Sequence, residues 1–270
     1  MQTKWYYCMR NYPPKESKQE YMSKKDELKR YISGSGLEIG ALHNPLKLPA
    51  LQAKVSYVDM CAKGALEKQN PEIKATEIIV PDINASAEDL SVFPDNSQDF
   101  VILCHVLEHL SNPVKAVKEI FRVLKPAGVF YLSIPDKRYT FDKARPVTAL
   151  SHLLEDFKNN TTFKNDGAHY KEWLEMVELK KEKPVASTLE ELVKGEYRIH
   201  FHVWEPESIP ELLNYLQNNM SVFFLLKDYY YKKGDPDLIY VLEKKTEAQS
   251  LIQNKLKENY SFLRRLLSRY

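Results

Sequence analysis

An acidic residue and a glycine stand at the end of one apolar run, and a second acidic residue stands near the end of the next. Glu38 and Gly40 close the run at residues 37–40, and Asp59 lies 19 positions after Gly40. A glycine turn after a buried strand lets the backbone approach a bound cofactor, and a carboxylate about 20 residues further on binds the two hydroxyls of a ribose. This spacing predicts a site for a ribose-containing cofactor.

A second candidate for chemistry is the pair His200 and His202, which alternate along the run YRIHFHVW at residues 197–204. Alternate residues of an extended segment point to the same face. Two imidazoles on one face suit a metal ion or a polar substrate, and they also suit two core histidines with satisfied hydrogen bonds. The pattern leaves these alternatives open.

Length, charge and cysteine content limit the class of protein that positions these residues. The chain has 270 residues and a net charge of +2, with 39 Lys plus Arg against 37 Asp plus Glu, so non-specific nucleic-acid binding is not expected. We find no run of about 18 apolar residues and no signal peptide, which predicts a cytoplasmic protein. Cys8, Cys61 and Cys104 are widely spaced, so we expect thiols rather than disulfides or a zinc site.

Short apolar runs alternate with helical stretches from Leu37 onward, a pattern typical of a parallel sheet flanked by helices. The expected strands cover residues 37–40, 55–60, 77–80, 99–106 and 128–135. Their nearly continuous apolar character suits burial on both faces. A crossover helix is expected from Pro113 to Pro126, because apolar residues recur there at helical spacing between two prolines. We therefore predict an α/β fold with a Rossmann-like, doubly wound, mostly parallel sheet.

The strand pattern stops after the fifth run. Residues 136 to about 200 have polar helical character, which predicts a helical cap inserted into the domain. Beyond the cap we expect a helix at residues 207–219 and strands at residues 221–231 and 237–245. Since a short turn joins these two strands, they must be antiparallel, and the sheet should end in a hairpin.

Two segments flank the expected domain, which runs over residues 31–245. Residues 1–30 form an N-terminal extension. Residues 246–270 place leucines on one helical stripe beside lysines and arginines. This amphipathic helix either docks on its own domain or contacts an anionic membrane or a partner protein. The oligomeric state is not indicated.

Three phrases follow one another in an order that is typical of one enzyme family. They are DNSQDFV at residues 95–101, LEH at residues 107–109 and RVLKPAG at residues 122–128. Together with Glu38 and Gly40, they resemble the class I S-adenosylmethionine-dependent methyltransferases of the small single-domain type. The resemblance covers roughly residues 37–135, less than half of the chain.

The resemblance implies S-adenosylmethionine as the cofactor and assigns residues to its parts. Glu38 and Gly40 correspond to the motif that holds the methionine part, and Asp59 corresponds to the ribose ligand. His105, at the end of the fourth strand, would face the methyl donor. The full predicted cofactor set is Glu38, Gly40, Ala41, His43, Asn44, Asp59, Met60, Asp82, Ser86, Ala87 and His105.

The chain departs from the family pattern at three positions. In the adenine-binding loop, expected within residues 84–90, the family's acidic residue falls on Ser86, so Asp82 or backbone amides would hold the adenine. Leu42 occupies the second glycine position of the first motif, and Ala127 replaces a glycine before the fifth strand. Leu42 is therefore expected to narrow the pocket or shift its loop.

Methyl transfer to a hydroxyl needs in-line alignment and a base with a pKa near neutrality. Candidate groups at the carboxyl edge of the sheet or in the cap are His105, His109, Asp136, His152, His169, His200 and His202. From these we predict a catalytic set of His105, His109, Asp136, His200 and His202. No resident metal ion is predicted.

A narrower resemblance concerns the acceptor. Residues 134–142, with the HNP at residues 43–45, resemble bacterial methyltransferases of surface-polysaccharide biosynthesis. This implies a sugar hydroxyl of a glycan or activated sugar as the acceptor, with Lys137, Arg138 and Arg145 either contacting a phosphate or solvated. The alternatives are N-methylation of a small amine and a degenerate cofactor-binding scaffold that recruits a glycosyltransferase or a membrane.

Overall fold

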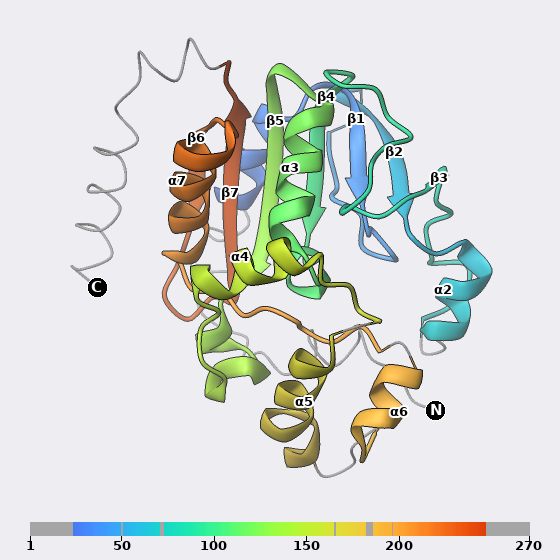
Figure 1. Ribbon diagram of the computed structural model, residues 1–270. Coiled ribbons are helices and arrows are strands. Elements are labelled where there is room, and N and C mark those ends of the chain that lie inside the picture. The colour runs from blue at the N-terminus through green and yellow to red at the C-terminus, as the bar shows by residue number, and fades with distance from the viewer. Residues whose placement is uncertain are drawn as a thin grey trace.

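A computed structural model describes residues 24–49, 51–70, 73–164, 166–181, 186–195 and 197–246. A seven-stranded sheet lies at the centre, in the order β3-β2-β1-β4-β5-β7-β6 (Figure 1). Cys8, most of the expected N-terminal extension and the expected C-terminal helix lie outside the described residues. Among the described helices, none has the length and apolar character needed to cross a membrane.

The first part of the sheet is parallel. Its strands are β1 (Gly34–Ile39), β2 (Ala53–Asp59), β3 (Ile83–Asn84), β4 (Gln98–Cys104) and β5 (Leu124–Pro135). Phe100, Ile102 and Leu103 of β4 have no exposed surface, as expected for a central strand that is covered on both faces. The prediction of a Rossmann-like α/β fold is confirmed.

The prediction of a strand at residues 77–80 is wrong. The segment that pairs with β2 is the short β3, which begins at Ile83. Ile78 is instead buried in a small apolar cluster with Leu42, Leu66 and Ile73. Its hydrophobic character therefore reflects packing beside α2 (Lys63–Gln69) rather than a place in the sheet.

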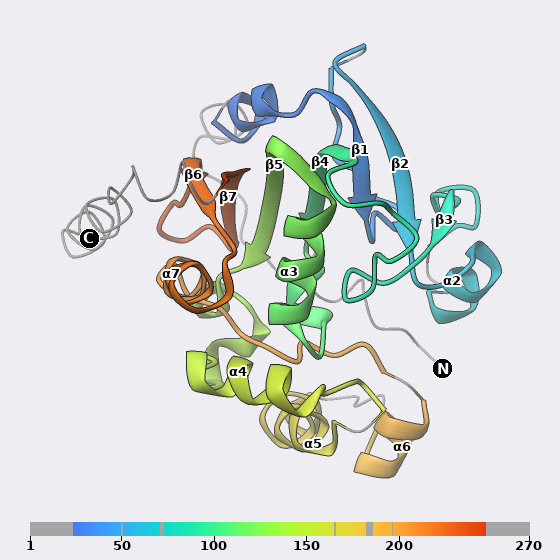
Figure 2. The same ribbon diagram turned by 45° about the horizontal axis from the view of Figure 1, so that its top comes forward.

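Helix α3 (Pro113–Val123) forms the expected crossover between β4 and β5. Proline occupies the first turn, and the Asn112 side chain accepts a hydrogen bond of 3.1 Å from the Lys115 amide, as an N-cap does. The apolar side of α3 packs on one face of the sheet, next to α7 (Ser208–Met220) (Figure 2). The helix ends before Pro126, because β5 already begins at Leu124.

The sheet ends in the predicted antiparallel hairpin. Strand β7 (Asp237–Lys244) runs antiparallel to β5 and to β6 (Phe224–Tyr230). Residues 24–31, which are helical, pack on the face of the sheet opposite α3, where Leu28 joins side chains of β4, β5, β6 and β7. Both faces of the central strands are therefore covered.

Between β5 and α7 the chain forms helices and short turns. They are η4 (Lys137–Tyr139), η5 (Phe141–Ala144), α4 (Leu150–Asn159), α5 (Gly167–Met176), η6 (Glu178–Lys180) and α6 (Leu189–Lys194). Figure 1 shows α4, α5 and α6 beneath the carboxyl ends of the parallel strands. Tyr170, Trp173 and Leu192 share a small core of their own with Phe201. This region brings its polar side chains to the edge of the sheet at which parallel α/β proteins bind ligands.

Candidate functional site

A pocket lies at the carboxyl ends of β1, β2 and β4. The residues of the predicted site that line it are Gly40, Asp59, Met60, Ser86, Ala87 and His109. Leu42, Val106 and Leu110 add apolar wall, and Arg198 lines the pocket from the segment between α6 and α7. The pocket thus combines an apolar interior with a few polar groups, which is typical of a cofactor site.

Gly40 makes the turn that borders the pocket. Its backbone has φ = 72°, and its amide donates a hydrogen bond of 2.9 Å to the Val58 carbonyl. A Cβ at this position would lie 2.6 Å from Cγ2 of Val106, so only glycine fits without a shift. Two residues later Leu42 has φ = 49°, a left-handed conformation at the position where the family pattern has glycine. Its buried side chain packs against Leu66 and Ile78.

Asp59 is the acidic group at the pocket rim. Its Oδ1 accepts a hydrogen bond of 3.0 Å from the Cys61 amide. Burial raises the pKa of Asp59, while the Cys61 amide and the Arg198 guanidinium oppose this shift. Arg198 lies over the Phe163 ring, 4.1 Å from its centroid, and was not among the predicted site residues. The only sequence signal for it was a basic residue just before the HFH run at residues 200–202.

Several predicted cofactor residues lie outside the pocket wall. Asp82 is exposed and accepts a hydrogen bond from the Tyr57 amide, and Ala41, His43 and Asn44 follow the Gly40 turn. Glu38 is buried beneath it: its Oε1 accepts a hydrogen bond of 2.7 Å from the Leu46 amide, and its Oε2 has no hydrogen-bond partner. Burial raises the pKa of Glu38 to about 7.

Three predicted catalytic histidines meet at Glu108, whose side chain is completely buried. Oε1 of Glu108 lies 3.5 Å from Nδ1 of His105 and 3.9 Å from Nε2 of His109. Glu108, His109 and His200 each offer a nitrogen or oxygen atom within 4.8 Å of the others. We call His105, Glu108, His109 and His200 the Glu108 cluster. Glu108 was not a predicted site residue, although it stands in the LEH phrase of the family motif.

The histidines of the Glu108 cluster differ in charge. Nδ1 of His109 donates a hydrogen bond of 2.9 Å to the Ile199 carbonyl, which leaves the lone pair on Nε2. Burial and the neighbouring His200 lower the pKa of His109 to about 4. Burial would also lower the pKa of His105, but the carboxylates of Asp237 and Glu108 raise it to about 10. At neutral pH His109 can therefore accept a proton, whereas His105 is a cation.

His200 is held by a buried acidic partner. Its Nδ1 lies 2.6 Å from Oδ2 of Asp142, and Asp142 also forms an ion pair of 2.8 Å with Arg145. Burial, the largest single effect, raises the pKa of Asp142, but His200 and Arg145 together outweigh it and bring this pKa below its usual value. The His200 and His109 rings meet edge to face, with centroids 4.6 Å apart. Asp142 thus fixes the orientation of His200 beside the pocket residue His109.

The other predicted catalytic residues lie elsewhere. The Asp136 carboxylate is fully buried and binds the Arg138 guanidinium through both oxygens. His202 contacts Asp156 and the Leu110 carbonyl, so it does not share a site with His200. The expectation of a common face is wrong because residues 197–203 do not form a regular strand.

The three cations expected to contact a phosphate are all bound within the chain. Arg138 pairs with Asp136, and the buried Arg145 pairs with Asp142 and Glu172. Lys137 is buried and lies 3.7 Å from Glu205. Lys137 and Arg145 are therefore not solvated, whereas Arg138 keeps 37% of its side chain exposed beside its ion pair with Asp136.

Solved structures similar to this chain come from several organisms. A protein of Pyrococcus horikoshii is 21% identical, with 85% of this chain and 93% of that chain covered and a TM-score of 0.45. A SAM-dependent methyltransferase from Aquifex aeolicus is 14% identical, with 83% and 88% covered and a TM-score of 0.42.

Sequence comparisons indicate the class of enzyme. Residues 33–132 match the family model described as "Methyltransferase domain". An uncharacterized protein of Methanocaldococcus jannaschii is 32% identical over 163 residues, which are 60% of this chain and 70% of that protein. A probable S-adenosylmethionine-dependent methyltransferase of Mycolicibacterium smegmatis is 48% identical over 52 residues, 19% of this chain and 20% of that protein. The chain is an S-adenosylmethionine-dependent methyltransferase, and S-adenosylmethionine is its cofactor.

The residues around the pocket fit this cofactor. The carboxylate of Asp59 could bind the ribose hydroxyls, and the loop with Ser86 and Ala87 could contact the adenine beside the apolar wall. The buried Oε2 of Glu38, which has no hydrogen-bond partner, suits the positively charged amino group of the methionine part. The glycine turn at Gly40 permits the close approach that such a ligand requires.

Proposed function

We propose that this methyltransferase acts on a hydroxyl group of a polar acceptor, namely a sugar of a glycan or an activated sugar. The observation that carries the proposal is the position of His109, a neutral imidazole in the wall of the cofactor pocket and beside the buried Glu108. A hydroxyl must lose its proton as it is methylated. His109 is placed to accept this proton, and the Glu108 carboxylate, which raises the pKa of His109, offsets part of the effect of burial that makes this imidazole a weak base.

Each part of the Glu108 cluster has a role in this proposal. The cofactor supplies a methyl group that is activated by the sulfonium. Nε2 of His109 takes the proton of the acceptor hydroxyl, because Nδ1 holds its own proton against the Ile199 carbonyl. The Glu108 carboxylate, 3.9 Å away, stabilises the imidazolium that forms. His200, held by Asp142, borders the acceptor.

In this proposal Arg198 has the role that the sequence suggested for Lys137, Arg138 and Arg145, namely contact with a phosphate group of the acceptor. It is a pocket residue from the cap side, and its guanidinium stacks on Phe163. Arginine binds phosphate through two parallel N–H donors. In our proposal Arg198 therefore contacts the phosphate of an activated sugar, or the carboxylate of an acidic one.

One observation favours N-methylation as a second candidate. Neither carboxylate oxygen of Glu108 has a hydrogen-bond partner, and their nearest cationic contact is the ion pair of 3.5 Å with His105. A buried carboxylate attracts an ammonium group. A small amine could therefore take the place of the hydroxyl. Bound as an ammonium, it would first pass one proton to Glu108, and its freed lone pair would then attack the methyl group without the help of His109.

The two candidates are tested with labelled S-adenosylmethionine and two acceptor panels, nucleotide-activated sugars with oligosaccharides and small primary and secondary amines. We expect label in the first panel as a methyl ether that is identified by mass spectrometry and NMR. The His109→Gln variant should lose this product. Methylated amine as the main product, with turnover insensitive to His109→Gln, would replace the hydroxyl proposal by the amine candidate.

A further inference from the structure

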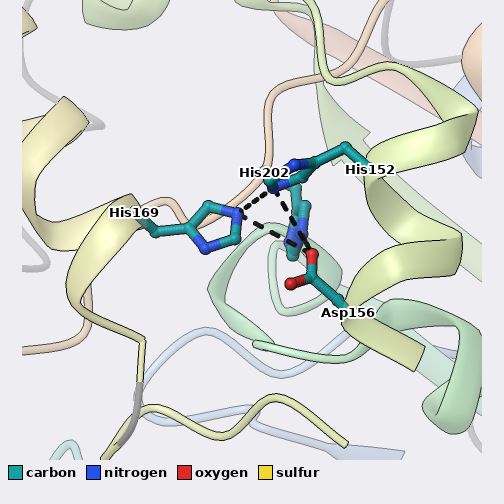
Figure 3. Close-up of side chains that lie close together, drawn as sticks. All are labelled: His152, Asp156, His169 and His202. Carbon is teal, nitrogen blue, oxygen red and sulfur yellow. Dashed lines mark hydrogen bonds and ion pairs between the residues drawn. The ribbon is translucent and has the colours of Figure 1, made fainter. Parts of the chain in front are cut away.

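A second cluster of ligand-type side chains lies in the cap. It consists of His152 and Asp156 on α4, His169 in the first turn of α5 and His202 in the segment before α7 (Figure 3). We call these four residues the Asp156 cluster. One nitrogen or carboxylate oxygen from each lies within 4.8 Å of those of the other three.

We propose that the Asp156 cluster binds a single divalent transition-metal ion, with zinc as the expected occupant. The proposal is independent of the acceptor that the enzyme methylates. It also departs from the sequence-based expectation that no metal is bound, because His152, His169 and His202 come together only through the folding of three separate segments.

The atomic separations suit a four-coordinate ion. The Nε2 atoms of His152 and His169 are 2.7 Å apart. Oδ2 of Asp156 lies 3.0 Å from Nε2 of His202, 3.5 Å from Nε2 of His152 and 3.9 Å from Nε2 of His169. Ligands at zinc–nitrogen distances of 2.0–2.1 Å in a tetrahedron are separated by about 3.3 Å. The four side chains therefore surround a point that needs only small adjustments to hold an ion.

The helical spacing contributes two of the ligands. His152 and Asp156 are four residues apart on α4, so both point from the same face of this helix. Figure 3 shows His169 and His202 approaching that face from two other segments. An i, i+4 pair completed by distant residues is a common way in which proteins build zinc sites.

The hydrogen bonds of the outer nitrogens aim lone pairs at the centre of the cluster. Nδ1 of His202 lies 3.0 Å from the Leu110 carbonyl, and a carbonyl can only accept, so this nitrogen carries the proton. Nδ1 of His169 likewise faces Oδ1 of Asp166 at 2.5 Å. The lone pair on Nε2 of His202 then points at the Asp156 carboxylate, 3.0 Å away, an electrostatic conflict that a cation at the centre removes.

The same outer contacts are those of metal-binding histidines. A ligating imidazole usually donates its other N–H to a carboxylate or a backbone carbonyl, which fixes its orientation. Asp166 and the Leu110 carbonyl have these roles for His169 and His202. Asp156, His169 and His202 are at most 6% exposed, whereas 43% of the His152 side chain is exposed. The site is thus closed by protein on all sides except that of His152.

The ligand set indicates the class of metal. Three imidazoles and one carboxylate favour zinc and neighbouring borderline metals, whereas Mg²⁺ and Ca²⁺ prefer oxygen ligands. Four protein ligands around a buried centre are typical of a structural zinc site. Such an ion would tie α4 and α5 to the segment that carries Arg198 to the pocket.

The test uses the full-length protein without an affinity tag, produced in zinc-supplemented medium and measured by elemental analysis. We expect about one zinc ion per chain. After the ion is removed with a chelator, titration with Co²⁺ should give the strong visible absorption of tetrahedral cobalt. A folded protein without stoichiometric zinc and without this absorption would overturn the proposal and leave a network of hydrogen bonds only.

Two variants on α4 separate ligation from general effects on folding. His152→Ala removes the exposed ligand, and we expect its Co²⁺ affinity to fall more than about 100-fold. Glu155→Gln changes an exposed residue next to Asp156 and should bind Co²⁺ as the wild type does. Both variants should melt like the wild type in the presence of chelator. Equal Co²⁺ affinity in wild type and His152→Ala would contradict the proposal.

Discussion

His200 and His202 are two residues apart, yet they belong to clusters that differ in accessibility and in chemistry. His200 joins the Glu108 cluster, which includes the pocket residue His109 and contains a cation at His105. His202 joins the Asp156 cluster, in which every imidazole directs a nitrogen toward one carboxylate. The first arrangement suits proton transfer at a substrate, and the second suits ligation of an ion.

The difference shows that histidine count and spacing do not determine what a histidine cluster does. In both clusters the backbone fixes the tautomer, through the Ile199 carbonyl for His109 and the Leu110 carbonyl for His202. What differs is the group opposite Nε2. His109 borders a pocket that can admit an acceptor, whereas His202 meets Asp156 in the protein interior.

The largest effect is expected from His109→Gln, which removes the base from the Glu108 cluster. We expect kcat to fall about 10²–10⁴-fold, the usual contribution of a general base. Zinc content should remain that of the wild type, because the Asp156 cluster is not altered. Rates from labelled S-adenosylmethionine and elemental analysis check the two results. A variant that retains full kcat would show that the Glu108 cluster does not act as a base.

A smaller effect is expected from Asp166→Asn in the Asp156 cluster. Asp166 orients His169 without being a ligand, and loss of such an outer partner typically weakens metal binding about 10–100-fold. Competition with a chromophoric chelator measures this change. An unchanged zinc affinity would indicate that the orientation of His169 does not matter, which would weaken the contrast between the clusters.

The His105→Gln variant tests the cation in the Glu108 cluster through its pH dependence. The folded pKa of His105, about 10, lies above its ordinary value of 6.5, so the charged form stabilises the fold fully below pH 6.5 and loses this effect as pH rises toward 10. We expect the variant to be less stable than the wild type by about 2 kcal/mol at pH 6, with a smaller difference at pH 10. Urea unfolding at both values measures it. A difference that does not depend on pH would contradict the charge assignment.

The smallest effect is expected from a substitution of Ala127, which lies outside both clusters. Ala127 is exposed and has φ = 64°, a strained conformation that glycine adopts at no steric cost. We expect Ala127→Gly to increase the free energy of unfolding by about 1 kcal/mol.

Leu42→Gly relieves a similar backbone strain but removes a buried side chain, so it should reduce the free energy of unfolding by about 2 kcal/mol. Equal changes in the two variants would mean that burial of Leu42 contributes little.

Much of the cofactor pocket could be predicted from local sequence. Gly40, Asp59 and Ser86 stand directly at or after strands, and parallel strands bring their carboxyl ends to one edge, so their meeting in a pocket could be predicted. The strand that the apolar pattern predicted around Ile78 was wrong, because this residue packs beside a helix and not in the sheet. The apolar pattern also gave no sign that Leu42 would adopt a left-handed conformation.

The cap half depended on contacts between distant residues. The spacing of four residues places His152 and Asp156 on one face of a helix, but nothing in the local sequence indicates that His169 and His202 join this pair. Arg198 reaches the pocket because residues 197–203 cross the carboxyl edge of the sheet, with the Phe201 amide bound to the Glu108 carbonyl. Single-sequence patterns of period 2 or 3.6 contain no information about such pairings.

Leu110 belongs to both regions: its side chain lines the cofactor pocket, and its carbonyl binds His202. An ion or a cofactor that displaced this residue on binding would alter the geometry at both places and would thereby change the affinity for the other ligand. Thermodynamic reciprocity then requires that an ion in the cap changes the affinity for the cofactor by the same factor by which the cofactor changes the affinity for that ion.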